Sequence, residues 1–245
     1  MVRYGSFLMV ALAVAMVAAP ASGALFEQNF DGVEDNTTLV DLGWKSSHWQ
    51  SIIRVRNEQI DTATAATGWD RMYYPFDSAV TTGIIQLEVD LDGGSGNYDS
   101  SIGFTGKDGT NGTGDRAATV RPLGDGNICI VGTQVGGVNT NVCSTISGSA
   151  HAQLTIDLDT LDVSAVISPL DGQNGGADFP LTGMTLDNTN GLGITGMWLM
   201  GGNPGGNTGD FKADNIVVNM VIPEPATLGL MGLGGLLVAM RRRKA

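Results

Sequence analysis

Apolar and polar residues alternate along several short segments of the chain. IQLEVDLD (85–92) places Ile, Leu, Val and Leu on one side and Gln, Glu, Asp and Asp on the other. LTIDLD (154–159) repeats the pattern. Because successive side chains of a strand point to opposite faces, these segments predict strands with one buried and one solvated face.

Residues 25–222 follow the same plan throughout. No convincing amphipathic helix is found there, and 30 glycines between residues 25 and 222 separate short apolar runs. Dense Gly, Asn and Asp between such runs predict frequent turns. The sequence therefore predicts an all-β fold with two packed sheets. The further strand candidates are 51–55, 71–76, 101–105, 118–121, 162–168, 196–200 and 211–219.

Each end of the chain carries a targeting pattern. A lone Arg3 precedes an apolar stretch over 7–19 and then small residues, which predicts a signal peptide over 1–24, read by the export translocon. Cleavage is expected after Ala24, with Ala21 as the second choice. The exported domain then spans 25–222, and a separate tail spans 223–245.

The charge of that domain limits its partners, and its cysteines indicate whether it forms a disulfide. Residues 25–222 hold 24 acidic and 8 basic side chains, a net charge of about −16 against −12 for the whole chain. Such a field repels nucleic acid, so the sequence predicts no nucleic-acid partner. Cys129 and Cys143 flank a predicted hairpin around Gly136-Gly137, which in an oxidising compartment predicts a disulfide.

The two ends of the exported domain carry a resemblance to a known fold. FEQNFDG (26–32) opens it and GDFKADNIVVN (209–219) closes it, and this pairing resembles the concanavalin A-like jelly rolls of laminin-G-type and carbohydrate-binding modules. The resemblance implies a two-sheet jelly-roll sandwich whose first and last strands lie side by side. It also implies a structural calcium between those strands, for which Glu27, Asp31 and Asp214 are the candidate ligands.

Two further groups of side chains suggest sugar chemistry. Glu88, Asp90 and Asp92 form an E-x-D-x-D run like that of jelly-roll glycosidases, although the family pattern ends in Glu; the alternative is an acidic stripe on a solvated strand. Trp69, between Gly68 and Asp70, is the candidate for stacking on a sugar ring, whereas Trp198 lies in an apolar run typical of a core.

The C-terminal tail has three parts in fixed order. Pro223-Glu224-Pro225 is held extended by its prolines. Fifteen uncharged residues follow over 226–240, about 22 Å as a helix against a hydrocarbon layer of roughly 30 Å. Arg241, Arg242, Arg243 and Lys244 complete it and are expected to stay in the cytoplasm. This tail resembles the PEP-CTERM sorting signal of Gram-negative bacteria.

That resemblance implies recognition of Pro223, Glu224 and Pro225 by exosortase, a membrane transpeptidase. The apolar segment 226–240 would be a transient membrane helix, and 241–244 a basic stop signal. The chain is thus expected to cross the inner membrane, stay anchored with its domain outside the cytoplasm, and reach the cell surface or exterior, where family members accompany extracellular polysaccharide. We predict a non-enzymatic surface or matrix protein; the alternatives are a calcium-dependent carbohydrate-binding module and a glycoside hydrolase.

Overall fold

The computed structural model of the 245-residue chain describes residues 22–46, 53–62, 69–92, 100–106, 116–123, 127–133, 139–186, 193–202 and 211–221. The predicted signal peptide up to residue 21, the tail 223–245 and the expected turn at Gly136-Gly137 lie outside these ranges. Within them, no helix has the length and apolar character needed to cross a membrane. Ala24–Met220 forms a compact unit.

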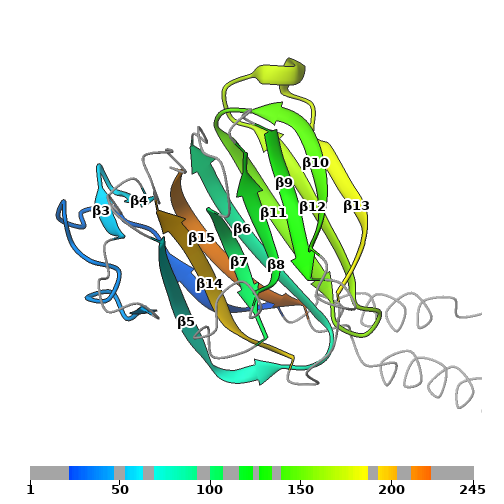
Figure 1. Ribbon diagram of the computed structural model, residues 1–245, viewed down its shortest axis with the longest axis horizontal. Coiled ribbons are helices and arrows are strands. Elements are labelled where there is room, and N and C mark those ends of the chain that lie inside the picture. The colour runs from blue at the N-terminus through cyan, green and yellow to red at the C-terminus, as the bar shows by residue number, and fades with distance from the viewer. Residues whose placement is uncertain are drawn as a thin grey trace, which may run out of the picture. The chain divides into compact units, whose positions relative to one another are not determined.

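The larger of its two sheets, sheet A, has eight strands (Figure 1). Seven follow one another in the order β13-β12-β11-β6-β15-β4-β3, and β1 pairs with β15. The strand bounds are β1 Ser22–Gln28, β3 Arg54–Arg56, β4 Gln59–Asp61, β6 Ile84–Asp92, β11 Ala150–Asp157, β12 Asp162–Pro169, β13 Phe179–Thr185 and β15 Lys212–Val221.

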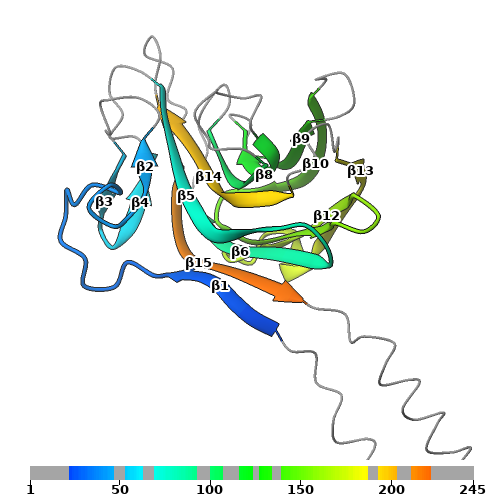
Figure 2. The same ribbon diagram turned by 90° about the horizontal axis from the view of Figure 1, so that it is seen from below.

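The second sheet, sheet B, has seven strands in the order β10-β9-β8-β7-β14-β5-β2. Its strand bounds are β2 Lys45–Ser46, β5 Trp69–Val80, β7 Ser101–Thr105, β8 Arg116–Pro122, β9 Asn127–Thr133, β10 Asn139–Ser147 and β14 Ile194–Gly202. Figure 2 shows the two sheets as layers, with β5 and β14 in one and β6, β12 and β15 in the other.

The hydrophobic core lies between the sheets and is built by the alternation seen in the sequence. Ile85, Leu87, Val89 and Leu91 of β6 are at most 1% exposed, and their neighbours along the strand face solvent on the other side of sheet A. Sheet B contributes Ile102 and Phe104 of β7, among others, to the same cluster. This confirms the predicted all-β, two-sheet sandwich.

The first and last strands lie side by side, as the jelly-roll resemblance implies: β1 pairs with β15 and begins near the end at which β15 finishes (Figure 2). Phe26 of β1 packs against Trp44 and Tyr74, with ring centroids 6.1 and 4.5 Å away, so this strand is also tied to Tyr74 of sheet B and to Trp44, which precedes β2. Because β1 already begins at Ser22, cleavage after Ala24 would remove its first three residues, whereas cleavage after Ala21 leaves it whole.

Sequence and structure differ most in the strands that do not alternate. The expected strand 51–55 is found as β3 at Arg54–Arg56, and the expected 71–76 extends to the twelve residues of β5. The edge strand β13, FPLTGMT, was not expected at all, because its proline and glycine are typical of a turn. Both residues are tolerated there because an edge strand pairs on one side only.

Candidate functional site

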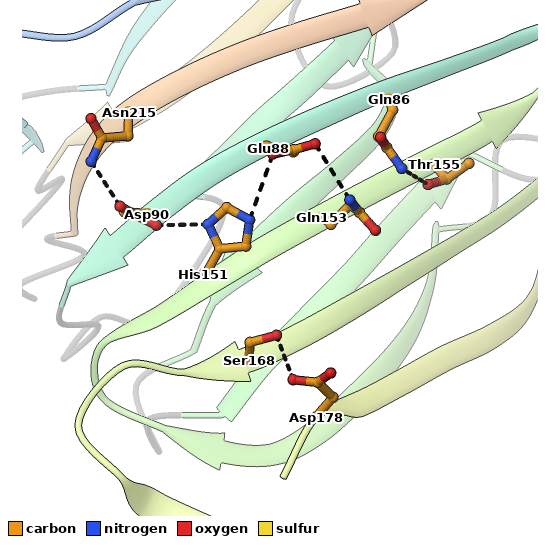
Figure 3. Close-up of polar contacts among 9 residues, drawn as sticks. All are labelled: Gln86, Glu88, Asp90, His151, Gln153, Thr155, Ser168, Asp178 and Asn215. Carbon is orange, nitrogen blue, oxygen red and sulfur yellow. Dashed lines mark hydrogen bonds and ion pairs between the residues drawn. The ribbon is translucent and has the colours of Figure 1, made fainter. Parts of the chain in front are cut away.

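The acidic run of β6 lies on the outer face of sheet A, where it pairs with polar side chains of β11. Gln153 stands opposite Glu88 and donates to it at 3.4 Å; Gln86 donates to Thr155 at 3.2 Å. Figure 3 shows these pairs as successive rungs along the two strands. They form a ladder of cross-strand contacts, the usual way in which polar faces of antiparallel sheets are stabilised.

His151 occupies the next rung of this ladder, opposite Asp90. Its Nδ1 lies 2.7 Å from Asp90 Oδ1, and its Nε2 lies 3.9 Å from Glu88 Oε2. Asn215 of β15 donates to the second oxygen of Asp90 at 2.8 Å (Figure 3). A single imidazole therefore lies between two carboxylates on a face where all three side chains are about one-third exposed.

Asp92 is held at the end of the strand, by the Ser149 hydroxyl at 2.6 Å and by Lys212 Nζ at 4.0 Å. All three carboxylates of the E-x-D-x-D run are thus engaged by neighbouring side chains. This arrangement is the one expected for a solvated strand face. Beside it lies a shallow pocket of about 270 Å³. The pocket is lined by Gln59, Asp90, Leu91, Asp92, Ser149, Leu170, Asp214 and Asn215.

The proposed calcium ligands do not gather into a coordination sphere. Asp214 lies near Asp31 and Asp90; burial, followed by these two carboxylates, raises its pKa, although it accepts hydrogen bonds from the backbone of Asn215 and Phe30. Among the described residues, no group of three or more His, Cys, Asp or Glu side chains could hold a metal ion. The described residues therefore do not fit the calcium site that the resemblance implied through Glu27, Asp31 and Asp214.

The outer face of sheet B has a different character, because its centre is buried. Trp198 and Val131 are 0% exposed and Met200 is 1% exposed, yet none of them belongs to the core cluster between the sheets. Their strand neighbours Met197, Leu199 and Ile130 do belong to it, which places the first three on the opposite side. Trp198 is therefore buried as expected, but outside the main core.

Polar side chains share this buried face with Trp198. The pairing register places Trp198, Gly103 and Thr119 in one row across β14, β7 and β8. Arg116 places its guanidinium 5.8 Å from the centroid of the Trp198 ring, a cation–π distance. Trp198 Nε1 and Thr119 Oγ1 are both buried, and within the described part of the chain neither has a hydrogen-bond partner. Unsatisfied buried polar groups are rare in folded proteins and call for an explanation.

A half-buried rim borders this centre. Tyr73 lies opposite Trp198 in the same row, Arg71 lies opposite Met200, and Arg121 lies opposite Cys129. Trp69 begins β5 and pairs with Gly202, so it lies in a strand and not in the turn expected from the sequence. We call Arg71, Tyr73, Gly103, Arg116, Thr119, Arg121 and Trp198 the sheet B face.

Cys129 and Cys143 lie at the β10 edge of the same sheet. They stand directly opposite each other in β9 and β10, and a disulfide joins them across a sequence separation of 14 residues. Cys129 is buried and Cys143 is exposed. The bond therefore fixes the register of the outermost strand pair of sheet B.

Sequence reasoning missed the sheet B face for an identifiable reason. Strands such as ITGMWLM (194–200) are apolar at both alternating positions, a pattern that a central core strand also produces. Arg116, Thr119 and Trp198 come from different strands, so only the pairing register brings them together. The sequence offered one signal: the strand at 194–200 is apolar on both faces, although only one face of a strand in a two-sheet fold points to the core. The expected recognition residues Pro223, Glu224 and Pro225 and the basic residues 241–244 lie outside the described residues.

Comparison with known families concerns the tail. The PEP-CTERM protein-sorting motif matches residues 221–244. The chain therefore carries this sorting motif, which indicates export. No curated protein sequence matches the chain.

Comparison with solved structures concerns the fold. The chain is similar to the CBM2 module of the evolved Dit of Lactobacillus casei BL23 phage J-1, with a TM-score of 0.56 and 10% identity over 84% of this chain and 99% of that one. The chain is also similar to basic winged bean lectin with Tn-antigen, with a TM-score of 0.51 and 11% identity over 81% of this chain and 99% of the lectin. Its similarity to a sialidase has a TM-score of 0.50 and 10% identity, over 80% of this chain and only 18% of the sialidase. These likenesses show a lectin-like jelly-roll fold.

Proposed function

We propose that the protein is an exported, exosortase-processed surface or matrix protein that binds extracellular polysaccharide on the sheet B face and does not hydrolyse it. The sorting motif supports the export and the tail processing. The lectin-like fold is compatible with carbohydrate binding but does not establish it. The assignment of the sugar site comes from the side chains themselves.

One observation carries the site assignment: unsatisfied hydrogen-bond donors are buried beside an aromatic ring. Trp198 Nε1 is a donor only, and the Thr119 hydroxyl both donates and accepts. Sugar rings offer many hydroxyl groups together with apolar C–H faces, which aromatic rings cover. Leaving such groups unpaired costs about 1–3 kcal/mol each, so a ligand that pairs them gains that free energy.

The half-buried rim gives a ligand its first contact with this face. Arg71, Tyr73 and Arg121 are partly accessible around the buried centre. Because Trp198 and Thr119 are 0% exposed, a ligand that contacts them has to displace the side chains packed around them. Binding is therefore expected to change the surroundings of Trp198.

Binding can be tested with the full chain purified in detergent and run through gels containing single polysaccharides. We expect at least one polysaccharide to retard the chain, and Trp198→Phe to reduce the retardation because it removes Nε1. Glu88→Gln on the outer face of sheet A is the matched control and should be retarded like the wild type. EDTA should change nothing, and no reducing ends should appear. Equal mobility in every gel would contradict the proposed function.

A further inference from the structure

Charge is distributed unevenly between the two sheets, and this indicates which class of polysaccharide fits the sheet B face. The described strands of sheet A contain eight acidic and three basic residues other than His151; those of sheet B contain two acidic and four basic residues. Three of the five arginines between residues 25 and 222 belong to the sheet B face. In so acidic a domain, this concentration of arginine is unexpected for a plain surface.

The arginines border the row that contains the unsatisfied donors. Arg71 and Arg121 occupy one neighbouring row, in register with Met200 and Ser101 and with Cys129. Arg116 occupies the row on the other side, opposite Thr105. Rows on one face of a strand are about 7 Å apart, so Trp198 and Thr119 lie between cations on both sides.

The two acidic residues of sheet B do not cancel this charge on the face. Both Asp70 and Asp77 belong to β5. Asp70 is 0% exposed, lies on the side of β5 that carries the core residue Met72, and accepts a hydrogen bond from the Ser46 hydroxyl at 2.9 Å. Asp77 is exposed, four residues along β5 from Tyr73.

We propose that the ligand of this face is an anionic polysaccharide, one whose sugar units carry carboxylate groups. This inference rests on the proposed function and names its ligand class. Guanidinium groups bind carboxylates through paired, charge-assisted hydrogen bonds. Each of the three arginines also has a partner within the chain, so the ligand adds to or exchanges existing contacts. Arg71 and Arg121 are three strand spacings apart, about 14 Å, which favours a polymer over one sugar ring.

The test compares polymers that differ in charge. Gels containing polygalacturonate, alginate or a neutral galactan are used with the full chain at low and high salt. We expect the two polyuronates to retard the chain and the galactan not to, with retardation decreasing as salt screens the charges. Arg121→Gln, which changes a half-buried side chain, should weaken the affinity for polyuronate about tenfold. Arg116→Gln should weaken it at least as much.

Arg56→Gln provides the matched control, since it removes the same charge from the exposed end of β3 in sheet A. It should leave polyuronate affinity within twofold of the wild type. If Arg56→Gln and Arg121→Gln weaken binding equally, the sheet B face is not the site. Binding to the galactan as strong as to the polyuronates overturns the anionic ligand and leaves the proposed function standing. No binding to any polysaccharide removes both.

Discussion

At the scale of single residues, the Thr119 hydroxyl is expected to lower the stability of the fold and to strengthen polysaccharide binding. Its hydroxyl is buried without a partner among the described residues, which costs about 1–3 kcal/mol. Thr119→Val keeps the shape and removes the unsatisfied group. We expect a more stable protein, with Tm raised by about 2–4 °C per kcal/mol recovered, and weaker polysaccharide binding. Thermal unfolding and gel retardation measure the two effects. A variant that binds like the wild type would show that this hydroxyl has no role in the site.

Asp214 gives the protein a predictable response to pH. Burial raises the pKa of its carboxyl, so the folded state holds the proton more tightly than the unfolded state. The stability that Asp214 contributes is therefore complete below the pKa of its carboxyl in the unfolded chain. It is lost as the pH rises through the pKa of the same carboxyl in the folded protein. Asp214→Asn should raise Tm at pH 7 and leave it nearly unchanged at pH 3. A larger gain at pH 3 than at pH 7 would contradict this sign.

At the scale of elements, Gly103 shows how closely β7 and β8 approach each other. A Cβ at this position would overlap the carbonyl oxygen of Ala118 and lie 2.5 Å from Thr119 Cα. Backbone atoms cannot move aside without breaking the pairing, so Gly103→Ala should cost about 3 kcal/mol or more. Gly172→Ala is the control: a Cβ there would have nothing within 4 Å, and a φ of +74° costs a residue other than glycine only about 1–2 kcal/mol. Urea unfolding of both variants measures the difference.

The disulfide between β9 and β10 acts on the edge of the same sheet. Closing a loop of 14 residues is expected to stabilise the fold by about 3 kcal/mol in the chain-entropy model. The double variant Cys129→Ala, Cys143→Ser should lower the urea midpoint accordingly. A thiol reductant should lower the wild-type midpoint and leave that of the double variant unchanged. Equal midpoints for wild type and variant in the absence of reductant would show that the bond adds no stability.

The elements predicted well from sequence are those whose two faces differ. β6 and β11 alternate strictly: β6 at Ile84–Asp92 lies within one residue of the expected 85–92, and β11 at Ala150–Asp157 overlaps the expected 154–159. β7 was found at Ser101–Thr105 as expected. The sheet B face could not be predicted, because Trp198 and Thr119 are 79 residues apart and are brought into one row by β7. The ladder partner His151 was likewise hidden, since its place opposite Asp90 depends on the pairing of β11 with β6.

At the scale of the whole molecule, the folded domain ends very close to the sorting motif. β15 ends at Val221, and Ile222 alone separates it from Pro223. The motif match itself begins at residue 221. Two prolines restrict the backbone conformations open to such a segment, which favours its binding by an enzyme. The proposed recognition of Pro223, Glu224 and Pro225 would therefore act on residues that follow β15 after Ile222 alone.

This position makes the tail the place where localisation can be changed without disturbing the sandwich. Glu224→Ala or Pro225→Ala should leave folding intact, because both residues follow the last strand. Each should keep the protein in the membrane fraction if exosortase recognises the tripeptide as proposed. Glu34→Ala, which changes an exposed carboxylate within the domain, should be released like the wild type. Fractionation with intact mass measures release and tail removal together. Release of the Glu224 variant with its tail removed as in the wild type would refute recognition through this tripeptide.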